Sequence, residues 1–482
     1  MTTFRGLYHV RSSWLYNRTL LLFLLLPLML AGGGIISRAT DHWVQMVGNG
    51  SSIHDGFGST SNVPDNKAVD LLRVFNGQLY AAVGRNETTN GNSLTVWRSS
   101  DLTNWSQVGV GAFTTNDLDC YSMETDGTRL FAGTHNASTT GANIYVTTNG
   151  NDWSMFNAPG VGFVRPGTIW ASHMGILNSN LFAGTLTISN KGQVWKRPCD
   201  GSVNWVKVVD FGTGLGVTGG VPASNPNACY FYTISNICFM PAGNFLYQSS
   251  DANGTNWIKN TQAGDGFGDA NNLNVSSLAC FNGYLYAPTH NTTAGGQLWR
   301  TTITNALANG SVPWEKVVNN GFDQGADVSE LHHITQGLGY IWISTQSSFA
   351  QVWRSADGTN WTRSNLIGFT TNNPTTSYKP MVETFNDWVV WGGASGTNAT
   401  GAQVWILGPL VSNPSLQIQG TGPNKLISWP DGALDYNLET STNLEGTPFW
   451  MSVTNSVVFS NNMKVVTFPA TAPCGFYRLR QP

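Results

Sequence analysis

The chain has 482 residues, of which 11% are charged and 12% are aromatic, and it contains 54 glycines and 19 tryptophans. This composition is typical of many short strands joined by turns and argues against a protein built from amphipathic helices. The formal net charge is only −3 and no basic patch is visible, which argues against nucleic acid as a partner.

Residues 1–39 have the pattern of a signal peptide. A basic segment with Arg5, Arg11 and Arg18 precedes an apolar stretch over residues 19–36. Ser37 and Ala39 then place small residues at the −3 and −1 positions, which predicts cleavage after Ala39. The alternative is an uncleaved membrane anchor, because this stretch is just long enough to span a bilayer. In either case we expect an exported protein, located outside the cell or in the cell envelope, with no other contact to a membrane.

All six cysteines follow the predicted cleavage site: Cys120, Cys199, Cys229, Cys238, Cys280 and Cys474. An even number of cysteines in an exported chain allows disulfides, although the sequence alone does not give their pairing.

Between residues 40 and 408 one sequence unit recurs. Its clearest copy starts as SSLACFNGYLYAPTHNTTAGGQLWRTT at residue 276 and ends as VPWEKVV at residue 318. Asn282-Gly283 is a common two-residue hairpin turn, and it separates a first strand ending near Phe281 from a second strand over residues 285–287. A loop, a third strand over residues 297–300 and a fourth strand carrying Trp314 complete the unit.

The fourth-strand tryptophan recurs at Trp105, Trp153, Trp205, Trp257, Trp314 and Trp361. A period of about 50 residues with four strands per unit predicts the blades of a β-propeller. A further copy over residues 381–407 lacks its fourth strand, while HWVQMV at residues 42–47 resembles the fourth strand VNWVKVV at residues 203–209. We therefore predict an all-β, seven-bladed β-propeller over residues 40–408, closed by an N-terminal strand at Trp43.

The acid in VWRSADGTNW (residues 352–361) belongs to a phrase that recurs before Trp105, Trp153 and Trp257. We assign Asp357 to a turn and not to catalysis, because such a side chain accepts bonds from backbone N–H groups two residues on. The phrase resembles the Asp-box (BNR) repeat of sialidase-like propellers, roughly Ser-x-Asp-x-Gly-x-x-Trp. The resemblance covers residues 42–408 and implies a secreted bacterial protein in which these aspartates are structural. The Arg-Ile-Pro signature of sialidases is absent.

The repeat stops after Gly408-Pro409, and residues 412–482 contain six or seven short alternating runs, which suggests a small β-sandwich. The phrases LISWP, YNLETSTNL and FYRL resemble an immunoglobulin/fibronectin III-like module at the C-termini of large exported bacterial proteins. This resemblance implies surface display, sorting or attachment. The alternative is a cap that stabilises the propeller.

Histidines are the best candidates for ligand binding. His135-Asn136 and His290-Asn291 occupy the same loop position in two units, on the face where the copies differ most. His173, and His332 with His333, fall near the start of the first strand in the unit that follows each loop. We expect either two equivalent sites for a polar ligand or metal, or ordinary hydrogen-bonding histidines.

Two further groups of residues with side-chain oxygens are candidate sites. Asp265, Asp269 and Asn271 in GDGFGDANN suit calcium, with turn formation as the alternative. Asp70 and Glu383 are predicted on first strands of neighbouring units and form a candidate carboxylate pair.

These patterns favour an exported, non-enzymatic recognition protein that binds a glycan or an extracellular protein through the variable face of the propeller. A sialidase-like glycoside hydrolase is the first alternative, and a structural envelope protein is the second. Two acids with raised pKa values in the central funnel would favour a hydrolase, whereas serine, threonine and histidine there would favour binding.

Overall fold

A computed structural model describes most of the chain after residue 40. The described residues are 41–48, 57, 66–85, 94–136, 141–156, 168–187, 192–221, 231–251, 253–260, 265–308, 313–370, 375, 378–394, 401–411, 413–444, 449–461, 463–469 and 475–480. The predicted signal peptide, Cys229, Cys474 and parts of the variable loops lie outside them. Among the described residues, no helix is long and apolar enough to cross a membrane.

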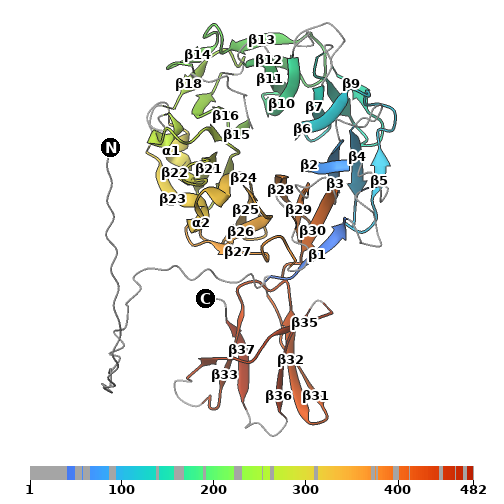
Figure 1. Cartoon of the computed structure of the whole chain (residues 1–482), viewed down its shortest axis with the longest axis vertical. Coiled ribbons are helices and arrows are strands. Elements are labelled where there is room, and N and C mark those ends of the chain that lie inside the picture. The colour runs from blue at the N-terminus through green and yellow to red at the C-terminus, as the bar shows by residue number, and fades with distance from the viewer. Residues whose placement is uncertain are drawn as a thin grey trace, which may run out of the picture. The chain divides into compact units, whose positions relative to one another are not determined.

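The protein is all-β, and its strands form antiparallel groups that follow one another around a ring (Figure 1). The first group is β2 (Asn66–Phe75), β3 (Gln78–Arg85), β4 (Thr95–Ser99) and β5 (Ser106–Val108). The next is β6 (Asp117–Thr125), β7 (Leu130–Asn136), β8 (Ile144–Thr147) and β9 (Ser154–Met155). It is followed by β10 (Thr168–Leu177), β11 (Asn180–Thr187), β12 (Gln193–Pro198) and β13 (Val206–Asp210).

The ring continues with β15 (Tyr232–Ile234), β16 (Ile237–Ala242), β17 (Phe245–Ser249) and β18 (Trp257–Lys259), with β14 (Val217–Thr218) beside β18. Next come β19 (Asn274–Val275), β20 (Ala279–Phe281), β21 (Tyr284–His290), β22 (Leu298–Thr302) and β23 (Glu315–Val318). They are followed by β24 (Val328–Gly337), β25 (Tyr340–Ser347), β26 (Gln351–Ser355) and β27 (Thr362–Arg363). Short helical turns interrupt the connections: η2 (Gly266–Gly268), α1 (Ile303–Ala306), α2 (Asn320–Asp323) and η3 (Gly325–Asp327).

The N-terminal strand closes the last group of the ring. β1 (Trp43–Val47) pairs with β30 (Ala402–Leu407), in a sheet whose order is β1, β30, β29 (Trp388–Ala394) and β28 (Tyr378–Phe385). The register places Trp43 opposite Leu407. This is the pairing that the sequence predicted, and it covers the edge that β30 would otherwise expose.

In three of the connections between groups, a phenylalanine packs against a tryptophan of the group that follows. Phe267 stacks on Trp299 at 5.2 Å and 11°, and Phe322 stacks on Trp353 at 4.2 Å and 5°. Phe369 repeats the arrangement on Trp405. All three phenylalanines have positive φ, an uncommon conformation for a bulky side chain. The aromatic contact therefore fixes a backbone that is unfavourable in isolation.

The turn that contains Asp357 has the structural role that the sequence predicted. Asp357 Oδ1 accepts bonds from the backbone N–H groups of Thr359 and Asn360, both at 2.8 Å. Burial acts to raise the pKa of Asp357, but these bonds lower it well below its usual range. Gly358 has φ +78° and lies directly against the Tyr286 hydroxyl of the preceding group. The turn is thus part of the contact between neighbouring groups.

Residues 413–480 form two antiparallel sheets. One contains β31 (Gln417–Thr421), β32 (Asn424–Pro430), β36 (Met463–Pro469) and β35 (Val458–Ser460), and the other contains β34 (Met451–Ser452), β33 (Asn437–Ser441) and β37 (Phe476–Arg480). Ile427 and Val466 from the first sheet and Leu438 from the second belong to one buried cluster. The two sheets therefore share a core.

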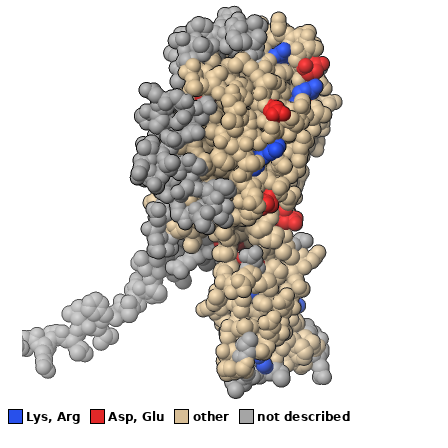
Figure 2. All heavy atoms as spheres, turned by 90° about the vertical axis from the view of Figure 1, so that its right-hand side faces the viewer, with Lys and Arg blue, Asp and Glu red and all other residues tan. Residues whose placement is uncertain are grey.

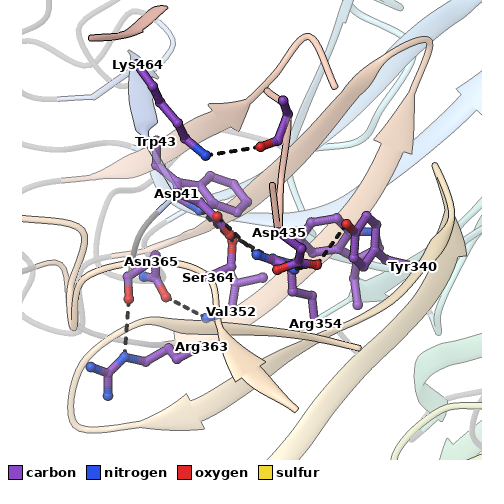
Figure 3. A network of polar contacts seen from close by, with 12 residues as sticks. Asp41, Trp43, Tyr340, Val352, Arg354, Arg363, Ser364, Asn365, Asp435 and Lys464 are labelled. Atoms are coloured by element: carbon purple, nitrogen blue, oxygen red, sulfur yellow. Dashed lines mark hydrogen bonds and ion pairs between the residues drawn. The ribbon is translucent and has the colours of Figure 1, made fainter. Parts of the chain in front are cut away.

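A buried arginine of the ring binds both the segment before β1 and the C-terminal sheets (Figure 3). On β26, Arg354 donates from Nε to Asp41 at 2.8 Å and from Nη1 to Asp435 at 2.6 Å. The side chains of Arg354 and Asp41 are 3% and 1% exposed. Ser364 donates to Asp41, and the Tyr340 hydroxyl donates to Asp435. Asp41 precedes β1 and Asp435 follows β32, so one guanidinium links the ring closure to the C-terminal sheets.

The four described cysteines, Cys120, Cys199, Cys238 and Cys280, are free thiols. Disulfides among them, which the even count allowed, are not present. Burial raises the pKa of Cys238 to about 12, so this thiol stays protonated and behaves as a small apolar side chain.

Gly358→Ala should destabilise the ring more than Gly339→Ala. Both glycines have positive φ, but a Cβ atom at Gly358 would overlap the Tyr286 hydroxyl, whereas Gly339 has no neighbour within 4 Å. Overpacking should add about 1–3 kcal/mol to the free-energy cost at Gly358. Urea unfolding of the two variants measures this difference. Equal destabilisation would show that the Tyr286 contact does not constrain the turn.

Arg354→Met should destabilise the protein by about 3–5 kcal/mol, because it leaves the buried Asp41 carboxylate without its cation. Arg300→Met is the matched control, since Arg300 lies at the corresponding position on β22, and its partner Glu315 has a side chain that is 62% exposed. An exposed pair is worth about 1 kcal/mol or less. Chemical denaturation measures the free energy of unfolding of both variants. Similar losses would contradict the role of Arg354 in linking the segment before β1 to the C-terminal sheets.

Candidate binding cavity at the centre of the ring

The first strands of the groups enclose a central cavity of about 250 Å³. It is lined from β2, β6, β10, β15, β20, β24 and β28, which lie nearest the centre of the ring in Figure 1. The lining mixes apolar side chains with charged and hydroxyl-bearing ones. A cavity with a few convergent polar groups is the expected place for a ligand.

Repeated β-bulges set which side chains point into the cavity. The register shifts between Val69 and Leu71 on β2, and the same shift recurs on β6, β10 and β24. The residues that follow the bulges line the cavity: Leu71, Ser122, His173 and His333. Because alternate residues of a strand face the same side, the residues two positions later line it as well: Arg73, Glu124 and Thr335.

Arg73 and two glutamates form the charged part of the cavity wall. Arg73 Nη2 donates to Glu124 Oε1 at 2.5 Å. Glu383 on β28 interacts electrostatically with Arg73, and its Oε1 accepts bonds from the Thr384 N–H at 2.9 Å and the Thr335 hydroxyl at 3.4 Å. Burial raises the pKa of both glutamates, and Arg73 partly opposes this effect. The three side chains come from neighbouring groups of the ring, so they also connect these groups.

His333 is held in one neutral form. Its Nδ1 lies 3.0 Å from the carbonyl oxygen of Val382, which only accepts, so Nδ1 carries the proton. Burial, followed by the neighbouring His332, lowers the pKa of His333 to about 3. His332 makes the same kind of bond to the carbonyl oxygen of Pro380. His333 is therefore a neutral cavity group over the physiological pH range.

The serines of the cavity wall connect first strands. Ser122 Oγ accepts a bond from the backbone N–H of Met174 at 2.8 Å, and Ser277 Oγ accepts one from Ile334 at 3.2 Å. The Oδ2 atom of Asp70 likewise accepts a bond from the backbone N–H of Cys120 at 3.1 Å. These bonds span neighbouring groups and explain why polar residues occur on such buried strands.

The structure places some of the candidate histidines in the central cavity. His173 and His333, which the sequence assigned to two separate sites, both line it. His135 lies on β7 with its Nδ1 3.2 Å from Asp119, and His290 ends β21. Neither His135 nor His290 belongs to the cavity lining. The pairing of each loop histidine with a strand histidine in the next unit stays a prediction.

The two candidate asparagines are internal to the fold. Asn136 is 1% exposed and donates to Asp117, and Asn291 is fully buried and donates to the Asn272 side chain at 3.0 Å. Both hold the end of a second strand against the start of a first strand. We assign them to the framework.

The proposed calcium residues have protein partners as well. Asp265 forms an ion pair with Lys259. Asp269 accepts bonds from the backbone N–H of Asn271 at 3.0 Å and from the Gln297 side chain at 2.8 Å. Within the described ranges, no group of three or more His, Cys, Asp or Glu side chains is arranged to hold a metal ion. These contacts belong to the turn, and the calcium assignment stays a prediction.

Two charged residues of the cavity, Arg73 and Glu124, were missed in the sequence. The sequence predicted Glu383 as half of a carboxylate pair with Asp70, whereas in the structure Glu383 interacts with Arg73. A signal was present, because Arg73 and Glu383 each lie two residues before the phenylalanine that precedes the first hairpin turn. A charged residue at an inward position of an apolar strand is a candidate for a central site.

Charged side chains are sparse on the face shown in Figure 2, where acidic and basic groups alternate without a continuous patch of one sign.

Comparison with known proteins finds structural neighbours but no relative in sequence. No family model and no curated protein matches the chain. It is similar to the β-propeller domain of Cps50 (Swd1) from Myceliophteria thermophila, with 10% identity, a TM-score of 0.42 and coverage of 70% of this chain and 95% of that one. It is also similar to the β-propeller domain of the Trilobed protease from Pyrococcus furiosus, which has an open velcro topology, with 9% identity, a TM-score of 0.40 and coverage of 71% and 94%. The protein is thus an all-β protein with β-propeller structural neighbours.

His333→Asn should reduce the dependence of stability on pH. The folded-state pKa of about 3 lies below the usual value of 6.5, so the unfolded chain takes up a proton that the folded chain does not between these values. The contribution of neutral His333 to the free energy of unfolding is complete above pH 6.5 and is lost as the pH falls towards 3. Asparagine preserves the bond to Val382 without titrating.

The measurement is the free energy of unfolding between pH 7 and pH 4, with Thr335→Val as a cavity control that has no titratable group. An identical slope in wild type and His333→Asn would refute the burial of a neutral imidazole.

Proposed function

We propose that the protein is an exported, non-enzymatic recognition protein that binds a glycan in and around the central cavity. The observation that carries this proposal is the mixed wall of the cavity, where Arg73, Glu383, His333 and Thr335 place donors and acceptors side by side. Sugars need many hydrogen bonds of both kinds together with apolar surface. The export of the chain rests on the pattern of residues 1–39.

The proposal includes the finer description of the scaffold. We infer seven blades, since the strand groups repeat the sequence unit and the last one is completed by β1. We infer that residues 412–482 form an immunoglobulin/fibronectin III-like sandwich, which is supported by the core shared between the two C-terminal sheets. An extracellular protein is the alternative partner for the variable face. A structural role in the cell envelope, without any ligand, is the other alternative.

A glycoside hydrolase is the second candidate, and one observation favours it. Glu124 and Glu383 are two buried carboxyl groups with raised pKa values in one cavity, as an acid and its partner require. Against it, Glu124 is bonded directly to Arg73, and this ion pair occupies a carboxylate oxygen that a nucleophile or base would need. We therefore prefer binding without hydrolysis.

A glycan array probed with residues 40–482 tests the proposal. We expect saturable binding to a defined class of glycan and no release of product over time. We also expect binding to persist in EDTA, because the oxygens of Asp269 are already used by protein donors. Loss of binding in EDTA would restore the calcium reading, turnover abolished by Glu124→Gln would favour the hydrolase, and a blank array would overturn glycan recognition.

A further inference from the structure

The central cavity has features that narrow the class of glycan, and this inference rests on the proposed function. We propose that the cavity binds one uncharged sugar residue, the terminus of a neutral glycan, against the guanidinium of Arg73 and the carboxyl group of Glu383.

The volume sets the size of the ligand. About 250 Å³ is below the range of about 300–1,000 Å³ that is usual for sites of drug-sized ligands. An extended oligosaccharide does not fit in such a space, whereas a single terminal residue does. The rest of the glycan then lies outside the cavity.

The polar groups of the wall have bonding capacity left for a ligand. A guanidinium has five N–H donors, and within the described residues Arg73 uses one of them, on Glu124. Its side chain is 32% exposed although it lies deep in the ring, since it lines the cavity. Both bonds accepted by Glu383 fall on Oε1, and no bond to Oε2 is present among the described residues.

This arrangement matches two adjacent hydroxyl groups of a sugar. The oxygen of one hydroxyl accepts from Arg73, and the oxygen of its neighbour accepts from the O–H of the protonated Glu383 carboxyl group. Tyr121, Phe231 and Tyr232 line other parts of the cavity and provide surface for the C–H face of the ring. A polyol therefore satisfies the polar groups and the apolar groups at once.

The charge balance excludes charged sugars. Arg73 and Glu124 compensate each other in a direct ion pair, and burial raises the pKa of Glu383, towards the neutral form. A sugar carboxylate would face two glutamates, and a sugar ammonium would face the guanidinium of Arg73. Each would bring an uncompensated charge into a site with little water, which is costly.

The test is calorimetric titration of residues 40–482 with matched sugars. The neutral probes are the methyl glycosides of glucose, galactose and mannose, the anionic probes are the corresponding uronic acids, and the cationic probes are the corresponding 2-amino sugars. We expect at least one neutral glycoside to bind at least tenfold more tightly than its acidic and amino counterparts. Equal or tighter binding of a charged counterpart would overturn the proposal.

Variants locate the binding in the cavity. Glu383→Leu should weaken binding of that glycoside by at least tenfold, while Glu315→Leu, at an exposed position on β23, should leave it within twofold. Glu383→Gln keeps the shape and polarity of a neutral acid, so it should stay within about threefold and also guards against misfolding of the leucine variant. A tenfold loss in Glu383→Gln would show that a charged carboxylate is required and would contradict an uncharged site.

The array separates this inference from the proposed function. Glycan binding that is unaffected by Glu383→Leu would overturn the cavity site and leave glycan recognition standing on the variable loops. A blank array would overturn both.

Discussion

Closure of the ring is the constraint on which the rest of the structure depends. Several groups of strands are joined to the next one by a phenylalanine stacked on a tryptophan, or to the preceding one by a glycine turn packed on an aromatic side chain. Such a chain of contacts leaves two open ends unless the last group meets the first. The pairing of β1 with β30 removes the open edge, and the bidentate bond of Arg354 to Asp41 holds the segment that leads into β1.

A closed ring of this kind cannot fill its own centre with apolar side chains from every strand. The first strands are held apart by the groups behind them, and their bulges turn alternate residues inward. Some inward residues connect neighbouring strands, as Ser122 does for Met174. Others, such as Arg73 and Glu383, keep bonding capacity towards the cavity. The same geometry that stabilises the ring thus produces a polar cavity.

The repeat made most of the scaffold predictable from sequence. The Trp spacing and the resemblance of residues 42–47 to a fourth strand predicted both the strand groups and the pairing of Trp43, because these features are local and recur. The site was less predictable, because it combines side chains that differ between copies. His173 and His333 were found as single residues, but their common cavity depends on the curvature of the ring. Asn136 and Asn291 were candidates because of their loop position, whereas the structure buries them as framework bonds.

The position of Asp435 bears on the role of the C-terminal sheets. A display module joined by a flexible linker would need no specific contact with the ring. Here Asp435 is bonded to the buried Arg354 and accepts the Tyr340 hydroxyl, and Lys464 on β36 donates to the Ala433 carbonyl oxygen within the same network (Figure 3). The sheets therefore contribute directly to the ring closure, which favours the cap that the sequence left as an alternative.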